Sequence, residues 1–173
     1  MTAIRPLGPD EREAYQAHLE RVDSVDHAPS LEDEAAFVLG AFADADGRTA
    51  LIGHLSVHLQ PLEHRTDLPL SLLELENASF SDSYPPGLVE GFVWTFDVEE
   101  AYRRRGIGRR LQLAALEECR RRGLYQLRSW SSLDRPANYA LKIGLGFAVH
   151  PGHAYLPRRE KWVRGVYFVM SLR

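Results

Sequence analysis

The feature that most constrains the fold is a strand, a glycine-containing turn and a helix that follow one another within one short stretch. LVEGFVWTFDV predicts a strand at 88–98. Its shared apolar face holds Phe92, Trp94, Phe96 and Val98. GIGRRLQLAALEECRRRG predicts a helix at 106–123, with Gly123 as its stop. The expected apolar stripe of that helix is Ile107, Leu111, Ala114, Ala115 and Cys119. A strand that leads into an amphipathic helix indicates helices packed over a sheet.

The remaining segments predict further strands and helices. We expect strands within 2–7, 34–60 (two, joined by the turn DADG), 124–132, 147–150 and 163–172, and helices at 10–22 and 134–146. Asp134 is the expected N-cap of the second of these helices, and Pro136 lies in its first turn. The proline-containing segment 60–88 is irregular, and it is either a lid or wall of a site or a surface insertion. The order predicts a mixed α/β domain with helices over a central sheet.

Size and composition limit the class of protein. The chain has 173 residues, which predicts a single domain over 1–173. Its net charge of −3 is unlike that of a nucleic-acid-binding protein. A single cysteine, Cys119, excludes an intrachain disulfide and a zinc site built from cysteines, and it is expected to be a small buried residue. With no signal-peptide pattern and no long apolar run, we expect a cytoplasmic protein without a membrane partner.

The turn between the predicted strand and helix has the composition of a phosphate-binding loop. Glycines let the backbone pass close to a ligand, and the free amides at a helix N-terminus attract anions. The glycines are Gly106 and Gly108, which flank Ile107, and the flanking cations are Arg103, Arg104, Arg105 and Arg109. The pattern therefore predicts a cradle for a diphosphate. A nucleic-acid patch is disfavoured because aromatic residues do not interleave with the arginines, and the arginines at 120–122 and Arg110 are expected to face solvent.

The string Arg103-x-x-Gly106-x-Gly108, after a strand ending in FDVEEAYRR, resembles the acetyl-CoA-binding motif of the GNAT superfamily of N-acyltransferases. The segment DRPANYALKIGLGF resembles the helix ending in GF that follows the next strand in that family. The resemblance covers most of the chain and is strongest between residues 90 and 150. It implies a mixed, largely antiparallel central sheet flanked by helices, with acetyl-CoA as the acyl donor.

The resemblance also implies how the donor is held. In the family, the amides of the motif bind the pyrophosphate of coenzyme A, and the preceding strand binds the pantetheine arm through its backbone. The amides of 97–99 are then expected near the thioester, with the Val98 N–H as oxyanion donor. Asn138 resembles the helix asparagine that bonds the coenzyme, although Arg135 stands at the aligned position. The amine is expected to attack the thioester directly, without a covalent enzyme intermediate.

Candidates for the proton transfers are less sharply defined. Glu90 is the expected general base, because a carboxylate among aromatic side chains can have a raised pKa; Glu74 and Glu76 are alternates. The family often has a tyrosine acid five residues before the Phe of GF, and that position is Lys142 here. Tyr139, one helical turn earlier, is the expected substitute. Lys142 is an alternative coenzyme contact.

Histidines and aromatic residues outside the motif invite further interpretations. His54 and His58 lie too far apart on a strand to share one metal ion, at about 13 Å, so we expect no metal site. The second group lies in the expected turn before the last strand, where relatives often border the acceptor amine, and it comprises His150, His153 and Tyr155. A solvated loop is the alternative interpretation of that group. Trp130 is expected either to line the acceptor pocket or to belong to the core.

The resulting hypothesis is an N-acetyltransferase that moves an acetyl group from acetyl-CoA to a primary amine. The acceptor is a small or peptidyl amine of undetermined identity. Acidic residues within 60–88 favour a cationic acceptor if that segment lines the site. The alternative is a non-catalytic acyl-CoA-binding module of the same fold. A homodimer that pairs through the aromatic last strand is a further expectation.

Overall fold

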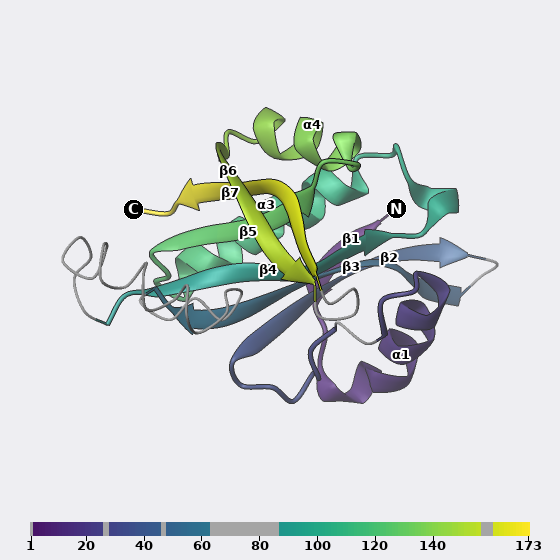
Figure 1. Ribbon diagram of the computed structural model, residues 1–173. Helices are drawn as coiled ribbons and strands as arrows, with labels where there is room; N and C mark the ends of the chain where they lie inside the picture. Colours follow the sequence, from purple (N-terminus) through teal and green to yellow (C-terminus); the bar gives the residue numbers. More distant parts are fainter. Residues whose placement is uncertain (1, 26–27, 46–47, 63–86, 157–160) are drawn as a thin grey trace. The chain divides into compact units, whose positions relative to one another are not determined.

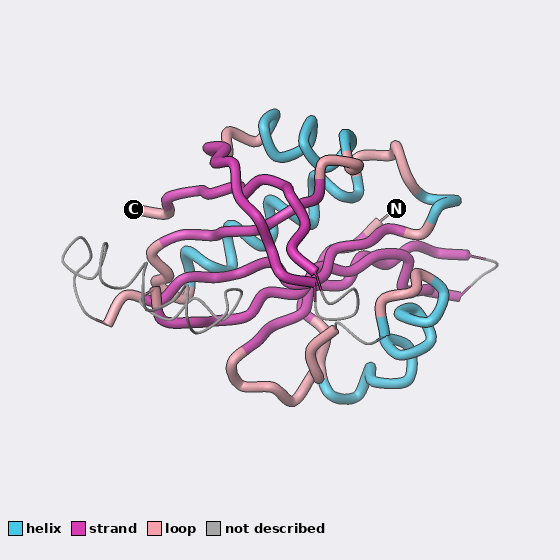
Figure 2. The backbone as a smooth tube through the Cα atoms, viewed as in Figure 1, coloured by secondary structure: helices cyan, strands magenta, loops and turns pink. Residues whose placement is uncertain are grey.

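The computed structural model describes residues 2–25, 28–45, 48–62, 87–156 and 161–173. Its elements, in chain order, are β1 (Ala3–Pro6), η1 (Pro9–Glu11), α1 (Arg12–Arg21), β2 (Ala36–Ala45), β3 (Arg48–Pro61), β4 (Val89–Val98), η4 (Glu100–Tyr102), α3 (Ile107–Arg121), β5 (Gln126–Ser132), α4 (Pro136–Gly144), β6 (Ala148–Leu156) and β7 (Lys161–Ser171). Figure 2 shows the same elements by type along the backbone. The predicted order of strands and helices is confirmed for the described residues. The stretch LSLLELENASF at 70–80, which can be interpreted as a strand, lies outside them.

The strands form a seven-stranded sheet in the order β1-β2-β3-β4-β5-β7-β6. The pairs β1–β2, β2–β3, β5–β7 and β6–β7 are all antiparallel. This confirms the predicted mixed α/β class with a largely antiparallel sheet. β7 is hydrogen-bonded to β5 along Gly165–Ser171 and to β6 along Lys161–Val169. Along these stretches its edges are already paired, and a dimer that pairs through the last strand stays a prediction.

The chain divides into two compact units, each built around part of the strands β3 and β4. Unit 1 comprises residues 1–58 and 93–121, and unit 2 comprises residues 59–92 and 122–173. The single-domain organisation stays a prediction, and the two units are described in turn.

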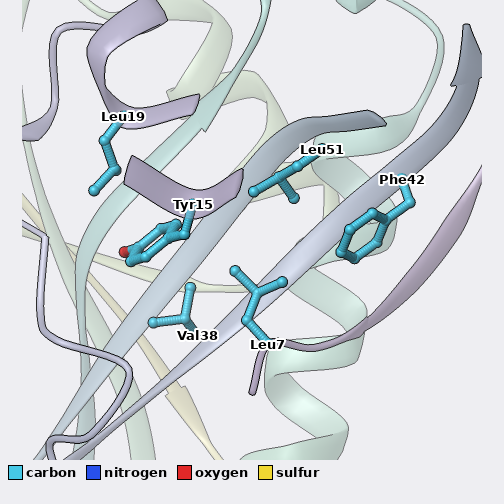
Figure 3. Close-up of a cluster of buried hydrophobic side chains, with 6 residues drawn as sticks. All are labelled: Leu7, Tyr15, Leu19, Val38, Phe42 and Leu51. Carbon is cyan, nitrogen blue, oxygen red and sulfur yellow. The ribbon is translucent and has the colours of Figure 1, made fainter. Parts of the chain in front are cut away.

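In unit 1, α1 lies against one face of β2 and β3, and α3 lies against the other (Figure 1). Both faces of these strands are therefore buried, and β2 is a nearly continuous buried run rather than an alternating one. Figure 3 shows the cluster on the α1 side, where helix residues pack on strand residues. Its members are Leu7, Tyr15, Leu19, Val38, Phe42 and Leu51.

The amphipathic pattern of α3 is confirmed with two changes. Ile107, Leu111, Ala115 and Cys119 are buried as expected, whereas Ala114 is only half-buried. The stripe is wider than predicted, since Gln112 and Leu116 are buried as well. The helix ends before Gly123, whose φ of +70° places it in the left-handed region expected of a helix stop. In the described part of the chain, no helix is long and apolar enough to span a bilayer.

In unit 2, β7 runs between β5 and β6, and α4 follows β5. Pro136 is the first residue of α4, as predicted, but the N-cap is Arg135 rather than Asp134. The Asp134 carboxylate instead accepts a hydrogen bond from the Ser132 hydroxyl, and this turn takes up the side chain that would have capped the helix. The short strand predicted at 147–150 is longer and runs from Ala148 to Leu156.

The burial of β4 departs from the expected single apolar face. Phe92 and Val98 are buried, but Trp94 is 43% exposed. The opposite face is buried as well, at Val93 and Thr95. A strand inside a sheet is covered on both sides, so tertiary packing rather than alternation decides which of its side chains meet solvent.

Candidate phosphate cradle and acyl-transfer residues

The connection from β4 to α3 is a compact turn. After Val98 the chain forms the short helix η4, and it then passes through two residues with positive φ, Arg104 at 64° and Gly106 at 76°. A left-handed conformation is easy for glycine and costs a residue with a Cβ about 1–2 kcal/mol. The reversal lets α3 begin at Ile107, directly after the second of these residues.

The surface of this turn is open and basic. Gly106 is exposed, and a Cβ built on it would meet no atom within 4 Å. Arg103, Arg104, Arg105 and Arg109 are exposed around it. The amides in the first turn of a helix have no partner within the helix, and the dipole adds positive potential there. Arginines at the positive end of a helix dipole repel it, and a bound anion offsets this repulsion. The arrangement therefore fits an anion such as a diphosphate. Residues 103–109 are called the cradle below.

The arginines around the cradle have different contacts. The Arg103 Nε donates to the carbonyl oxygen of Val98 at 2.8 Å, which ties the turn to the end of β4. The Arg105 guanidinium lies 5.5 Å from the ring centre of Tyr102 in η4. Arg110, expected to face solvent, is exposed but donates to the Thr2 carbonyl at 2.7 Å. Sequence spacing carries no sign of this last contact, because it joins residues 108 positions apart.

The end of β4 lies unusually close to β3. A Cβ on Gly53 would come within 3.1 Å of the Asp97 carbonyl and 3.2 Å of the Val98 side chain. The Glu99 amide donates to the Ile52 carbonyl at 2.9 Å. Of the amides expected near a thioester, that of Glu99 is therefore already bonded to β3. Gly53 admits the backbone of β4, a role that no local sequence pattern indicates.

In unit 2, Glu90 is the centre of a buried polar cluster. Its side chain is 0% exposed, and its two oxygens accept from Arg128 at 2.6–3.1 Å. Gln60 and Gln126 donate to the same carboxylate at 2.7 and 2.6 Å. The Arg128 guanidinium also lies 4.8 Å from the ring centre of Phe92. An aromatic ring thus lies against the guanidinium that Glu90 binds, and no local sequence pattern indicates this guanidinium.

The two candidate acids lie on α4. The Tyr139 ring packs edge-on against Phe168, and its hydroxyl donates to the Ser131 carbonyl at 3.4 Å. Burial, and then the nearby Asp134 carboxylate, raises the pKa of Tyr139. Lys142 is 1% exposed, and its Nζ lies 4.6 Å from the ring centre of Phe147. Burial lowers the pKa of Lys142 from 10.5 to about 7.

Three further polar groups of unit 2 are buried without a hydrogen-bond partner among the described residues. They are the hydroxyl of Ser129, the indole nitrogen of Trp130 and the amide oxygen of Asn138. A buried polar atom without a partner costs about 1–3 kcal/mol, so it marks a place where a ligand or a water molecule can bind. Asn138 therefore fits a contact to a coenzyme. Arg135, the aligned alternative, is an exposed N-cap residue.

The histidines lie on strands. His54 and His58 are both in β3; His54 bonds His18 and Thr95, while the His58 ring lies 4.8 Å from that of Trp94. Across the described ranges, no three His, Cys, Asp or Glu side chains are grouped as they would be to hold a metal ion. His150 and His153 belong to β6 and not to a turn, which corrects their predicted place. The acidic residues expected in the irregular segment, from Glu63 to Asp82, lie outside the described residues.

Comparison with known proteins places these features in a family. A family model described as the acetyltransferase (GNAT) family matches residues 4–147. No curated protein matches the chain. Among solved structures, Arabidopsis thaliana NAA60 in complex with acetyl-CoA is similar with a TM-score of 0.73 at 15% identity, covering 99% of each chain. The NatC complex bound to Gag peptide and CoA is similar with a TM-score of 0.69 at 16% sequence identity, also covering 99% of each chain.

A third solved structure has a different acceptor in its description. FeeM, an N-acyl amino acid synthase from uncultured soil microbes, gives a TM-score of 0.64 at 17% identity, covering 99% of this chain and 92% of that one. At these identities the likeness shows a shared fold. The family match covers strands of both units, the cradle and α4. The chain therefore belongs to the acetyltransferase (GNAT) family.

Proposed function

We propose that the protein transfers an acetyl group from acetyl-CoA to a primary amine by direct attack. The observation that carries the proposal is the cradle, an open basic turn at a helix N-terminus, directly after the β4 strand in a member of this family. The family match and the fold shared with an acetyl-CoA complex support the choice of donor.

Residues of unit 1 would hold the diphosphate of the donor. The amides of Gly106, Ile107 and Gly108 supply hydrogen bonds to its oxygens, and the side chains of Arg104 and Arg109 supply charge. Arg103 acts on the backbone, because its Nε fixes the Val98 carbonyl. The bound donor supplies an activated acetyl thioester.

The chemistry requires a neutral amine and a stabilised oxyanion. The amine nitrogen attacks the thioester carbonyl carbon and the carbon–sulfur bond breaks. The nitrogen loses one proton to water as the amide forms, and the sulfur takes up a proton and leaves as a thiol. We assign the Val98 N–H as donor to the developing oxyanion, a role worth roughly 3–4 kcal/mol in other enzymes. Much of the remaining rate enhancement comes from holding both reactants in one geometry.

Lys142 and Tyr139 compete for the role of proton donor to the sulfur. A thiol has an ordinary pKa of about 8.5. A Lys142 ammonium with a pKa of about 7 is acidic enough to protonate a thiolate. The Tyr139 phenol, whose pKa burial raises above 10, is a much weaker acid. Both side chains therefore stay candidates for the proton donor, with burial favouring Lys142 as the stronger acid.

Glu90 as general base stays a prediction. Its carboxylate accepts from Arg128, Gln60 and Gln126, so both oxygens already have partners. A base must expose a lone pair to the proton that it removes, and it does so here only by giving up one of these bonds. The contacts favour a stabilising ion pair.

The acceptor is a small or peptidyl amine. Proteins of this fold include one bound to a peptide and one described as an N-acyl amino acid synthase, so the fold alone favours neither class. A homodimer and a cytoplasmic location stay predictions, as does the absence of nucleic-acid and membrane partners.

Calorimetric titration with acetyl-CoA and, separately, with a short DNA duplex at physiological salt tests the donor assignment. We expect micromolar binding of acetyl-CoA and none of DNA; the reverse result would remove the proposal. Release of free thiol in the presence of a panel of small amines and of peptides with free N-termini then tests turnover. Binding without thiol release from any amine would favour the non-catalytic acyl-CoA-binding module.

A further inference from the structure

A continuous chain of hydrogen bonds crosses the interior of unit 1. Ser56 Oγ and Thr95 Oγ1 are 2.6 Å apart, and Thr95 Oγ1 lies 2.9 Å from His54 Nε2. His54 Nδ1 is 3.0 Å from His18 Nε2, and His18 Nδ1 is 3.1 Å from Glu99 Oε1. The five side chains come from β3, β4, α1 and the residue after β4. They are called the relay below.

The chemistry of the partners fixes the direction of every bond. An ionised Glu99 only accepts, so His18 carries its proton on Nδ1 and accepts at Nε2. His54 must then donate from Nδ1 and accept at Nε2, and the Thr95 hydroxyl donates to it. Ser56 donates to Thr95 in turn, while its own oxygen accepts from the Thr95 amide at 3.0 Å. All donors therefore point from Ser56 toward Glu99.

Burial keeps both rings of the relay neutral. It lowers the pKa of His54 to about 3, with the neighbouring His18 as the second cause. Burial also lowers the pKa of His18; Glu99 and Asp97 oppose the change, and Arg21 adds to it. A neutral ring that accepts at one nitrogen and donates from the other can pass a proton on without holding charge.

The two ends of the relay differ. The Glu99 side chain is 20% exposed and also accepts from Arg21 Nε at 2.8 Å, so this end reaches solvent. Ser56, at the inner end, is fully buried, and beside Thr95 the Tyr15 hydroxyl is buried without a hydrogen-bond partner among the described residues. Its ring packs edge-on against that of His54, and its oxygen points away from Phe42 (Figure 3). Thr95 is near enough to offset part of the rise that burial causes in the pKa of Tyr15.

One residue of the relay, Thr95, belongs to β4, the strand that leads to the cradle. Thr95 is three residues before Val98, the proposed oxyanion donor, and Glu99 is the residue after it. The orphan hydroxyl of Tyr15 marks a place beside Thr95 where a polar ligand atom or a water molecule would complete the hydrogen bonds. The same strand therefore carries both the proposed carbonyl contact and a path for protons.

We propose that Ser56, Thr95, His54, His18 and Glu99 form a proton relay that removes the proton lost by the acceptor ammonium, a role that rests on the proposed acetyl transfer. One N–H bond of the ammonium breaks, directly or through one water molecule, and its proton goes to Ser56 Oγ. Ser56 passes its own proton to Thr95, Thr95 to His54 Nε2, His54 from Nδ1 to His18 Nε2, and His18 from Nδ1 to the Glu99 carboxylate. Glu99 then releases the proton to water. Rotation of the hydroxyls and rings restores the starting tautomers.

A purely structural role would need the same contacts but not the negative charge at Glu99. The Oε1 of a glutamine at this position can still accept from His18 and Arg21, so Glu99→Gln preserves the shape while removing the terminal proton acceptor. The matched control is Glu11→Gln, a carboxylate of the same unit that pairs with Arg5 on the surface. In this way the comparison separates proton transfer from packing.

The test measures thiol release from acetyl-CoA across pH 5–9 with whichever amine of the small-amine and peptide panel gives turnover. We expect Glu99→Gln to lower kcat roughly 10²-fold, with KM for acetyl-CoA and folding unchanged and the acidic limb of the pH profile altered. Wild-type kcat and pH profile in a folded Glu99→Gln variant would overturn the relay alone. A wild-type protein that turns over no amine would overturn the proposed function and the relay with it.

A second measurement keeps the inference testable if Glu99→Gln does not fold. Nitrogen-15 NMR of the histidine rings in the wild-type protein distinguishes the two neutral tautomers. We expect His18 and His54 both to be neutral and protonated on Nδ1 at pH 7. A proton on Nε2 of either ring, or an imidazolium, would contradict the deduced direction and overturn the relay whatever the activity.

Discussion

The Arg103 Nε donates a 2.8 Å hydrogen bond to the carbonyl oxygen of Val98, so the first arginine of the cradle is bonded to the strand that precedes it. We expect Arg103→Lys, which keeps the charge but loses the directed N–H, to weaken acetyl-CoA binding by about 1.5–3 kcal/mol. Calorimetric titration checks this. Arg120→Lys, at the far end of α3, is the control. Unchanged affinity would mean that Arg103 acts only through its charge.

Gly106 and Gly123 form a matched pair at the two ends of α3. Both have positive φ, and a Cβ on either would meet no atom within 4 Å. Glutamate at either position therefore costs a similar backbone strain of about 1–2 kcal/mol. We expect Gly106→Glu to reduce acetyl-CoA affinity roughly 100-fold, about 2.8 kcal/mol, through bulk and charge where the diphosphate would sit. Gly123→Glu should bind normally, and equal affinities in the two folded variants would contradict the cradle.

The buried pair of Glu90 and Arg128 predicts a stability effect that is independent of catalysis. Glu90→Ala leaves a buried guanidinium without its carboxylate, and we expect a loss of about 3–5 kcal/mol in urea unfolding. Replacing both residues with methionine should recover much of this loss, because it removes both buried charges. If the double variant is folded and fully active, the prediction of Glu90 as general base is wrong.

The histidines of the relay make stability depend on pH in a defined direction. The folded-state pKa of His54 is about 3, below the unfolded value of 6.5, so the unfolded chain binds more protons between these values. Stability should be constant with respect to this group above pH 6.5 and fall as pH decreases from 6.5 toward 3. The slope is about 1.4 kcal/mol per pH unit for one such group. Unfolding at pH 7 and 5 checks it, and His54→Gln should show a smaller difference.

The two candidate proton donors, Lys142 and Tyr139, can be distinguished by the pH dependence of stability and by the kcat of their variants. The folded-state pKa of Lys142, about 7, lies below the unfolded value of 10.5. Between these pH values the unfolded chain still binds a proton that the folded protein has lost, so stability should rise with pH from 7 to 10.5. Lys142→Met should remove that rise and stabilise the protein at pH 7, as measured by urea unfolding. If Lys142 donates the proton to sulfur, wild-type kcat should decline above pH 7. The Lys142→Met variant should then have a strongly reduced kcat. A normal kcat in Lys142→Met and a reduced one in Tyr139→Phe would assign the role to Tyr139.

Local patterns are sufficient to predict most of the elements. The apolar spacing of α3 and the stop at Gly123 depend on neighbours within a few residues, so the sequence determines them directly. The cradle is also local, because its two glycines and its arginines lie within seven residues. For this reason the amino-acid sequence alone carries the family resemblance and the proposed donor site.

What the sequence by itself determined is therefore the order of the elements, the class of fold and the place of the cradle. Only the tertiary structure decided the partners of buried polar groups, such as Arg128 for Glu90 and His18 for His54. The physical reason is that the polar contacts join residues dozens of positions apart, and their strength depends on burial that the complete packing creates. The identity of a histidine or glutamate does not reveal whether its side chain is solvated, paired or part of a relay, and these surroundings determine its pKa and its hydrogen bonds.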